Sequence, residues 1–277
     1  MNLVEALRWG TATLEAAGVA SPAHDARALA LHVLGLHKPH ELVRVEEFPG
    51  EAYTALVEQR AARVPLQHLL GSVGFRWIEL QVGPGVFVPR PETEVVVGYA
   101  IDALPKDAAP VVVDLCTGSG AIALSVAHEV PGAVVHAVEL DPAALEWARR
   151  NDPRGTVTWH LGPVEGCLPD LDGAVDVVIS NPPYVAETER HLPDPEVIDH
   201  DPHLALFAGE DGLDVVREVE RAARRLLRPG GLLVVEHSDR QGESAPAVLE
   251  QAGGWAEVQD HQDLTGRDRY VTARWQG

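Results

Sequence analysis

The chain has 277 residues, 45% of them hydrophobic, which is enough to bury one large core or two unequal ones. Its formal net charge of -20 opposes attraction to nucleic-acid phosphates, which requires clustered Lys and Arg side chains. Cys116 and Cys167 lack any metal-ligand spacing, and the sequence contains neither a bilayer-spanning apolar stretch nor a signal peptide pattern. We therefore expect a soluble, cytoplasmic protein with no metal and no nucleic-acid or membrane partner.

Residues 1–70 are predicted to form a small helical domain. Ser21 followed by Pro22 is typical of a helix N-cap with proline at the first helical position. A further amphipathic run begins at Gly50 and ends before Pro65, which cannot continue a helix interior. These patterns contain no strand signal, so the N-terminal quarter of the chain is expected to be entirely helical.

Residues 71–90 have a different pattern, in which apolar residues alternate with others and glycines occur at 74, 83 and 85. Such a stretch predicts a β-hairpin or extended connector between two domains. The second domain is then expected to cover residues 91–277.

Within residues 91–277, short apolar runs alternate with amphipathic helices, which predicts a doubly wound α/β fold with a mostly parallel sheet. Helices are expected to begin near Ser119, Pro142, Leu213 and Gly242. A proline-rich, acidic segment over residues 186–203 is interpreted as a long loop over the site. The expected strands are Val111–Leu115, Val134–Leu140, Val157–Leu161, Val175–Ser180 and Leu232–Glu236.

A glycine-rich turn follows the first expected strand and precedes a helix, so a ligand can approach the backbone closely. Glu139 ends the next strand, where a carboxylate can accept hydrogen bonds from both ribose hydroxyls. The turn also satisfies the dinucleotide pattern, so a nicotinamide dehydrogenase stays open here. Asp114 favours a methyl donor, because an acid before the turn could bind the donor's amino acid portion. The residues of the turn are Cys116, Thr117, Gly118, Ser119 and Gly120.

Asn181, Pro182, Pro183 and Tyr184 follow the fourth expected strand, and ligands of open α/β sheets bind beyond the carboxyl ends of the strands. An amide or exocyclic amine nitrogen is a poor nucleophile, because its lone pair is delocalised. The Asn181 side-chain carbonyl and the Pro182 backbone carbonyl could grip its hydrogens, while the Tyr184 ring covers its flat face. The tetrapeptide therefore predicts the catalytic site of a nitrogen methyltransferase that works by alignment.

With these motifs, nearly the whole chain resembles the class I S-adenosylmethionine-dependent methyltransferases, and within them the release factor glutamine methyltransferase family. The most specific match is GVFVPRPETE at residues 85–94, because the NPPY tetrapeptide also occurs in adenine methyltransferases. The other matching segments are residues 114–124, Glu139 with residues 141–145, residues 181–184, residues 208–213, residues 228–231 and residues 263–269.

The resemblance implies N5-methylation of the glutamine in the Gly-Gly-Gln loop of class I peptide chain release factors, with S-adenosylhomocysteine as the second product. It also implies that the helical domain recognises the substrate, and we expect the protein to be a monomer. Substrate contacts are expected from Asn181 through Tyr184, with Phe87 and Arg90 bordering the donor methyl and the entering loop. The candidate donor-binding residues are Asp114, Cys116, Thr117, Gly118, Ser119, Gly120, Glu139 and Asn181.

Two alternatives accompany this hypothesis. An adenine-N6 methyltransferase of nucleic acid would also use the NPPY tetrapeptide, although the acidic charge opposes it. A dehydrogenase or other nucleotide-binding protein would use the glycine-rich turn. The chain also departs from the family pattern after the third strand, where residues 162–165 replace an acid and an aromatic in the adenine pocket.

Two polar clusters are set aside. His200 and His203, with Asp199 and Asp201, are interpreted as part of a solvated loop because they lack a helical or strand frame for a metal. The Glu236-His237 pair is interpreted as a capped strand end.

Overall fold

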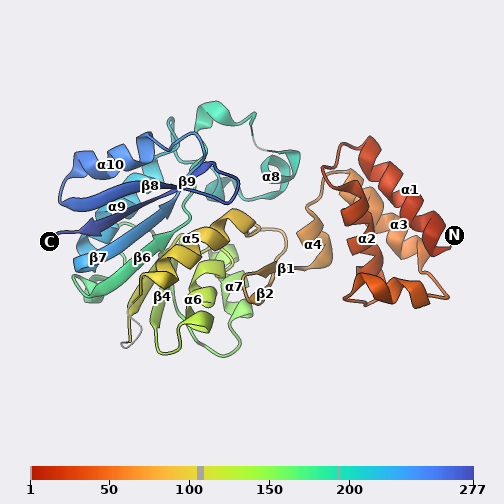
Figure 1. Cartoon of the computed structure of the whole chain (residues 1–277), viewed down its shortest axis with the longest axis horizontal. Coiled ribbons are helices and arrows are strands. Elements are labelled where there is room, and N and C mark those ends of the chain that lie inside the picture. The colour runs from red at the N-terminus through yellow and green to blue at the C-terminus, as the bar shows by residue number, and fades with distance from the viewer. Residues whose placement is uncertain (1, 105–108, 193) are drawn as a thin grey trace. The chain divides into compact units, whose positions relative to one another are not determined.

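The computed structural model describes residues 2–104, 109–192 and 194–277 (Figure 1). The chain forms two compact units. The first comprises Met1–Ser72 together with Asp194–His200, and the second comprises Val73–Pro193 and Asp201–Gly277. Among the described residues, every helix is too short or too polar to cross a membrane.

The first unit is helical, as expected. Its core is formed by apolar side chains of the first three α-helices, with Leu14, Leu29 and Tyr53 fully buried. Ser21 stands at the N-cap position of α2, but its side chain makes no capping hydrogen bond, so the expected cap is only positional. The elements are α1 (Leu3–Ala16), α2 (Pro22–Val33), the 3₁₀ helix η1 (Pro39–Arg44), α3 (Gly50–Ala61), α4 (Leu66–Leu70) and α8 (Pro195–His200).

A buried ion-pair network joins α8 to the other helices of this unit. The Arg60 guanidinium donates to the carboxylates of Asp25 and Glu196, each at 2.8 Å. Arg63 donates to the other oxygen of Glu196 at 2.5 Å. The two Arg60 partners come from distant parts of the chain. The helical unit therefore includes α8, which follows α4 by more than a hundred residues.

The second unit contains a seven-stranded sheet in the order β5-β4-β3-β6-β7-β9-β8. β3 to β7 run parallel, while β9 is antiparallel to both β7 and β8. A separate two-stranded sheet of β1 (Ser72–Phe75) and β2 (Ile78–Gln81) forms the expected hairpin. The large sheet consists of β3 (Val111–Leu115), β4 (Val134–Glu139), β5 (Thr158–Leu161), β6 (Val175–Ser180), β7 (Leu227–Glu236), β8 (Trp255–Gln262) and β9 (Asp268–Trp275).

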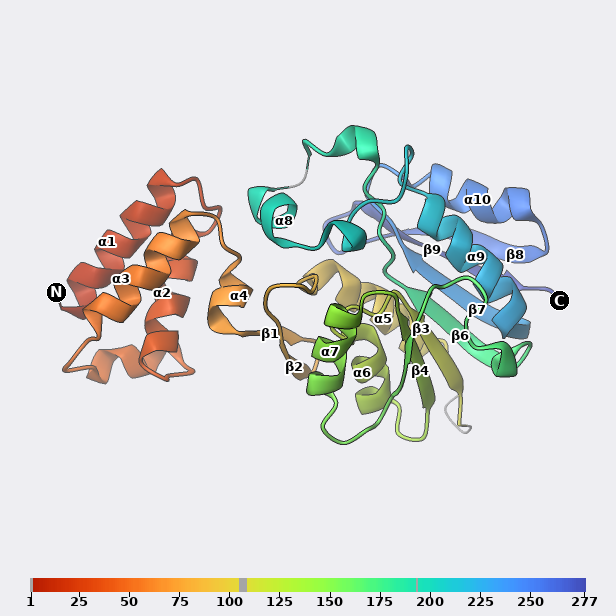
Figure 2. The ribbon, with the colours of Figure 1, turned by 180° about the vertical axis from the view of Figure 1, so that it is seen from behind.

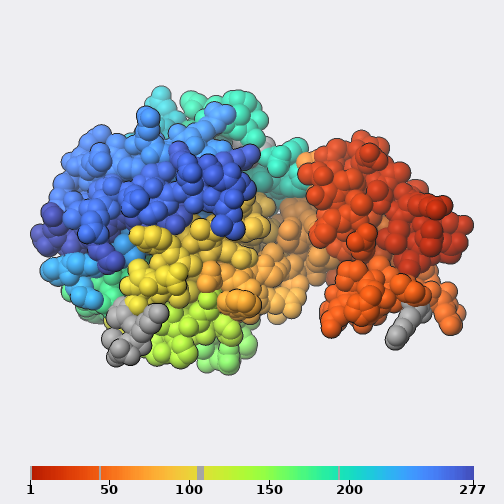
Figure 3. Space-filling view, viewed as in Figure 1, coloured from red at the N-terminus to blue at the C-terminus, as the bar shows by residue number. Residues whose placement is uncertain are grey.

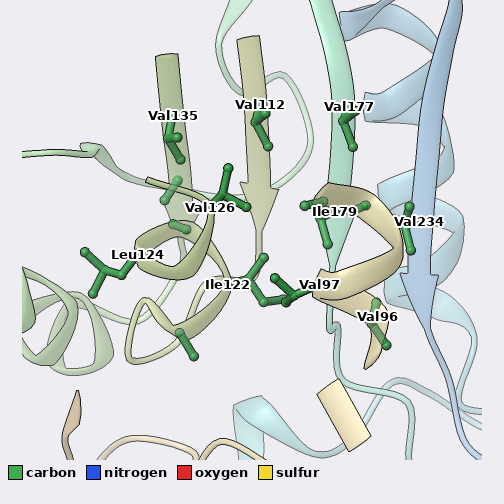
Figure 4. Close-up of a cluster of buried hydrophobic side chains, with 14 of the residues drawn as sticks. Val96, Val97, Val112, Ile122, Leu124, Val126, Val135, Val177, Ile179 and Val234 are labelled. Carbon is green, nitrogen blue, oxygen red and sulfur yellow. The ribbon is translucent and has the colours of Figure 1, made fainter. Parts of the chain in front are cut away.

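Helices cover both faces of this sheet, which confirms the doubly wound α/β prediction (Figure 2). Successive strand residues point to opposite faces. Val177 and Ile179 therefore pack with Val97 and Ile122 on one face (Figure 4), while Val178 packs on the other. The first face is covered by α5 (Pro91–Asp102) and α6 (Ala121–Glu129), and the second by α9 (Asp214–Leu226) and α10 (Ser244–Ala252). A further helix, α7 (Pro142–Asn151), contacts β2, β4 and β5.

The structure corrects three details of the expected fold. β8 and β9 were not expected as strands, and together with α10 (blue) and α5 (yellow) they form much of the surface of this unit in Figure 3. β7 begins at Leu227, before the expected Leu232. The segment over residues 186–203 is not one long loop. It contains the 3₁₀ helix η3 (Glu187–Glu189), then α8, and ends at η4 (His203–Ala205).

Candidate functional site

The carboxyl ends of β3 and β6 lie side by side, because these strands are parallel neighbours whose last pair is Leu115 with Ser180. The Ser180 hydroxyl donates a hydrogen bond of 2.7 Å to the Leu115 carbonyl oxygen. The glycine-rich turn begins at Cys116 and the tetrapeptide begins at Asn181, so both leave the sheet at the same edge. The two turns therefore begin side by side at the carboxyl ends of the strands, where ligands of open α/β sheets bind.

The glycine-rich turn is held in left-handed backbone conformations at three positions. Cys116, Gly118 and Gly120 have φ values of 62°, 57° and 86°. A Cβ atom on Gly118 would meet nothing within 4 Å, so this part of the turn faces open space. A Cβ on Gly120 would lie 2.8 Å from the Trp159 ring, so this glycine is required for packing. In this turn, Gly118 faces open space and Gly120 allows the turn to pack closely against Trp159 of β5.

Asp114 lies beneath the turn and is completely buried. Its Oδ2 accepts hydrogen bonds from the Thr117 hydroxyl at 2.5 Å and from the Ala123 backbone N–H at 3.1 Å. Its Oδ1 is buried and has no hydrogen-bond partner among the described residues. Burial raises the pKa of this carboxyl to about 7, although the two hydrogen bonds oppose the rise. Asp114 therefore shapes the turn with one oxygen and keeps an acceptor free on the other.

Glu139, at the end of β4, joins the turn to the start of α7. One carboxylate oxygen accepts from the Gly118 N–H and the other from the Asp141 N–H, both at 2.8 Å. Burial raises the pKa of Glu139, and these backbone hydrogen bonds oppose the rise. Each oxygen has a second lone pair, so the carboxylate can still accept from two hydroxyl groups of a ligand.

The edge beside Glu139 carries exposed apolar side chains. Leu140 follows Glu139 directly, and Leu161 is the strand partner of Glu139 on β5. Half or more of each leucine is exposed, at the carboxyl ends of β4 and of the edge strand β5. Gly162 follows Leu161 and donates its N–H to the Glu139 carbonyl at 2.8 Å. This edge can therefore support a flat apolar ring without the acid and aromatic pair expected after the third strand.

Asn181 is held by a residue that the sequence reasoning missed. Its Nδ2 donates to the hydroxyl of Thr93 at 3.1 Å, and Thr93 is buried in the first turn of α5. The structure gives the Asn181 Oδ1 no hydrogen-bond partner among the described residues. Thr93 lies in the family-specific PRPETE segment, which was the only sequence signal that could have indicated it.

The backbone of the tetrapeptide is anchored by Gln241, which was also missed. The Gln241 Nε2 lies 3.1 Å from the Tyr184 carbonyl and 3.3 Å from the carbonyls of Asp211 and Gly212. A Cβ on Gly212 would lie 2.4 Å from the Tyr184 carbonyl, so a side chain there would displace the tetrapeptide. Burial raises the pKa of the Tyr184 phenol, so this hydroxyl stays protonated and neutral near pH ~7. Pro182 is buried and Pro183 half-buried.

Phe87 and Arg90 lie together in the connector. The Arg90 guanidinium stands 4.9 Å from the centre of the Phe87 ring, and it donates to Asp201 Oδ2 at 2.8 Å. The Asp201 side chain is buried, which corrects its interpretation as part of a solvated loop. The Asp201 carboxylate can be buried because the Arg90 guanidinium supplies the opposite charge. No cluster of metal-binding side chains occurs among the residues that the structure describes.

Glu236 and His237, at the end of β7, are more deeply buried than a capped strand end requires. His237 is fully buried, with Nδ1 2.9 Å from the Ser238 carbonyl and Nε2 2.8 Å from Asp260. Glu236 is also buried, and its Oε2 has no hydrogen-bond partner among the described residues. Burial raises the pKa of Glu236 to about 7, while the positive charges of Arg269 and Arg90 oppose the rise.

Two family models match the chain. The model described as the PrmC N-terminal domain matches residues 5–71, and the model described as the methyltransferase small domain matches residues 81–194. Together they include residues 5–71 of the helical unit, the glycine-rich turn and the tetrapeptide.

Curated relatives match over the full length. A release factor glutamine methyltransferase of Streptomyces coelicolor is 54% identical over 278 residues, covering 99% of each chain. That of Mycolicibacterium smegmatis is 48% identical over 98% of this chain and 97% of its own. That of Deinococcus radiodurans is 44% identical, and the match covers 100% of both chains.

Solved structures share the fold at low identity. A methyltransferase from Pyrococcus furiosus aligns over 72% of this chain and 88% of its own, with a TM-score of 0.52 and 20% identity. The catalytic domain of hMettl16 aligns over 71% of this chain and 75% of that chain, with a TM-score of 0.53 and 18% identity. These two likenesses concern the fold alone.

Proposed function

The chain belongs to the release factor glutamine methyltransferase family, and on this premise we propose that it methylates the N5 amide nitrogen of the glutamine in the Gly-Gly-Gln loop of class I release factors. The methyl donor is S-adenosylmethionine, as in the methyltransferase family to which the chain belongs. The observation that carries the proposal is the meeting of the glycine-rich turn with Asn181 at one edge of the sheet.

The residues of the turn fit this donor. The free Asp114 Oδ1 suits an ammonium group, and the two Glu139 oxygens suit a pair of ribose hydroxyls. The open face of Gly118 lets the donor lie against the backbone, and Leu140 with Leu161 offers an apolar support for the adenine ring. When bound, the donor supplies a sulfonium methyl group that is already activated.

The tetrapeptide aligns the substrate amide. The Asn181 Oδ1 and the Pro182 carbonyl accept the two amide hydrogens, which favours a pyramidal nitrogen whose lone pair faces the methyl group. The Tyr184 ring fixes the amide plane by stacking. As the new nitrogen–carbon bond forms, the carbon–sulfur bond breaks, and one amide proton is then released to solvent. Phe87 and Arg90 border the path of the entering loop.

Adenine methylation remains the alternative chemistry of an NPPY tetrapeptide. The full-length relatives favour the protein substrate, because each is named for a release factor glutamine. The net charge of -20 agrees with a protein substrate, since it disfavours binding to phosphate backbones.

The test is incubation of the purified protein with S-adenosylmethionine and a class I release factor, followed by mass spectrometry of the loop peptide. We expect one added methyl on the loop glutamine and none on adenine-containing DNA or RNA of matched concentration. Asn181→Ala should lower turnover by ~10²-fold or more while donor binding persists. An unmodified release factor, or methylated adenine, would overturn the proposal.

A further inference from the structure

We propose that the β8–β9 turn, residues 263–267, is a docking surface for the release factor and presents Leu264 and Arg267 to the protein surface around the Gly-Gly-Gln loop. The partner surface that fits these two side chains is an apolar pocket with a carboxylate beside it. The inference rests on the proposed function, because it takes the release factor as the substrate. Residues 263–267 have no part in the methyl transfer itself.

The β8–β9 turn lies at the sheet edge that carries the tetrapeptide. β9 runs antiparallel to β7, and Tyr270 of β9 pairs with Glu236, the last residue of β7. The turn that precedes β9 therefore projects beyond the carboxyl end of β7 (dark blue in Figure 1). β6 is the parallel neighbour of β7, and its last residue, Ser180, pairs with Val235. The β8–β9 turn and the tetrapeptide thus leave the sheet at the same edge.

The base of the turn packs against the segment that anchors the tetrapeptide. Asp268 is the first residue of β9, and a side chain on Gly242 would overlap its carboxylate. Gln241, the residue before Gly242, donates to the Tyr184 carbonyl at 3.1 Å. The backbone that follows the turn and the backbone that holds the tetrapeptide are therefore in close contact.

The turn is held by one carboxylate. The Asp263 Oδ1 accepts from the Thr265 hydroxyl at 2.6 Å, from the Thr265 N–H at 2.8 Å and from the Arg267 N–H at 3.2 Å. The Asp263 Oδ2 accepts from the Arg269 guanidinium at 3.2 Å, and the Asp263 N–H donates to the Arg267 carbonyl at 2.8 Å. The Thr265 hydroxyl and the other donors lower the pKa of Asp263 to about 2. The carboxylate is thus charged at neutral pH, and an ordered turn loses little conformational entropy when a partner binds.

The side chains at the tip are free to meet a partner. Leu264 is 92% exposed, so its apolar character contributes almost nothing to the packing of the chain itself. Arg267 takes part in the turn through its backbone, and the residue is exposed. A single exposed leucine is common on protein surfaces, but this one stands on an ordered turn at the edge of the site. Its burial in a partner's pocket would strengthen binding by ~10-fold or more, and the Arg267 guanidinium would pair with a carboxylate.

The position of the site explains why the release factor would meet this turn. Ligands of open α/β sheets bind beyond the carboxyl ends of the strands, so the substrate glutamine approaches Asn181 from that side. The proposed substrate is a protein, and the surface around its glutamine must lie over whatever projects from the same edge. A charge at the rim of such an interface mainly sets orientation and the rate of association. Arg267 is a local positive charge in a chain whose net charge is -20, so it favours one orientation of the partner.

The test compares two tip variants with two controls. We expect Leu264→Asp and Arg267→Glu each to raise KM for the release factor by ~10-fold or more, with kcat changed by less than about threefold and Kd for S-adenosylmethionine by less than about twofold. The effect of Arg267→Glu should shrink as the NaCl concentration rises. The matched controls are Val134→Asp and Arg149→Glu, exposed residues at the start of β4 and in the last turn of α7. Both lie at the amino ends of the parallel strands, so KM should stay within about twofold of wild type.

A photo-crosslinking residue gives a direct measurement of the partner. With p-benzoylphenylalanine at position 264, irradiation should join the protein to the release factor in the domain that carries the Gly-Gly-Gln loop. The same residue at position 134 should give no such product. An unchanged KM in both tip variants, no crosslink from position 264, or a crosslink between two copies of this chain would overturn the docking surface, while methylation by the wild-type protein still supports the proposed function. If the wild-type protein leaves the release factor unmodified, the proposed function fails, and the docking surface fails with it.

Discussion

The Ser180 hydroxyl lies 2.7 Å from the Leu115 carbonyl oxygen and joins the last residues of β6 and β3 directly beneath the two turns of the site. A backbone carbonyl at the end of a parallel strand would otherwise need water or a ligand as its donor. The Ser180 side chain thus satisfies the last carbonyl of β3 at the sheet edge where the two turns of the site begin.

Ser180→Ala should lower the free energy of unfolding by about 1–2 kcal/mol, because a buried hydrogen bond is lost and a buried carbonyl remains without that donor. Urea unfolding followed by circular dichroism measures the change. Ser244→Ala is the matched control, since Ser244 is an exposed serine of the same unit. Equal loss in both variants would show that the Ser180 hydrogen bond does not contribute.

The two glycines of the turn should differ in their tolerance of alanine. Gly120→Ala adds a Cβ 2.8 Å from the Trp159 ring at a φ of 86°, so we expect a loss of ~2 kcal/mol or more in unfolding free energy. Gly118→Ala meets nothing within 4 Å, so only left-handed strain of about 1 kcal/mol is expected. Urea unfolding measures both free energies, and each variant is the control for the other. A larger loss for Gly118→Ala would contradict the packing argument.

Asp114→Asn tests the buried carboxyl through pH. Because burial raises the pKa of Asp114 to about 7, the folded protein keeps a proton that the unfolded chain releases near pH ~4. This contribution to stability is complete below about pH 4 and is lost as the pH rises through about 7. Relative to wild type, Asp114→Asn should therefore gain unfolding free energy over this interval. Its carbonyl can still serve Thr117 and Ala123, which both bind a single Asp114 oxygen.

The measurement is urea unfolding of both proteins at several pH values between about 4 and 8. A constant difference across the interval would mean that Asp114 titrates alike in the folded and unfolded chain. Isothermal titration calorimetry of S-adenosylmethionine binding gives a second measurement. The variant has an N–H₂ group, which cannot accept a hydrogen bond, in place of the free Asp114 Oδ1. Binding of S-adenosylmethionine should weaken accordingly.

Glu139→Gln should weaken donor binding by ~10-fold or more, since charged acceptors of hydrogen bonds contribute about 1.5–3 kcal/mol each. A glutamine can accept from the Gly118 N–H or from the Asp141 N–H, but not from both, so the turn also loses a hydrogen bond. Isothermal titration calorimetry with S-adenosylmethionine measures the affinity. The control is Glu250→Gln, an exposed carboxylate of α10 in the same unit. An unchanged Kd in Glu139→Gln would remove Glu139 from the donor site.

The central strands could be predicted almost to the residue, because burial on both faces makes them continuous apolar runs. Val111–Leu115 and Val175–Ser180 match β3 and β6 in full. β8 was missed because it is an edge strand, in which buried Trp255 is followed mainly by polar and half-exposed residues. Such a composition resembles a loop until its antiparallel partner is known.

The site was predictable only where its residues follow one another in the chain. The turn and the tetrapeptide are such local patterns, and their adjacency follows from parallel strands. Thr93 and Gln241 act on the tetrapeptide from positions 88 and 57 residues away. Asp201 becomes buried because Arg90, 111 residues earlier, provides its charge partner. No local pattern encodes these pairs, since each depends on how the whole chain folds.

The helical unit is not one continuous stretch of sequence, because Glu196 of α8 completes the surroundings of Arg60. A fragment cut after Ser72 would retain Asp25 but lose one of the two acids that neutralise this buried guanidinium. Engineers who exchange the helical unit between relatives must therefore transplant two separate pieces. The second piece is inserted in the polypeptide shortly after the tetrapeptide, so the helical unit and the sheet unit cannot be recombined at a single junction.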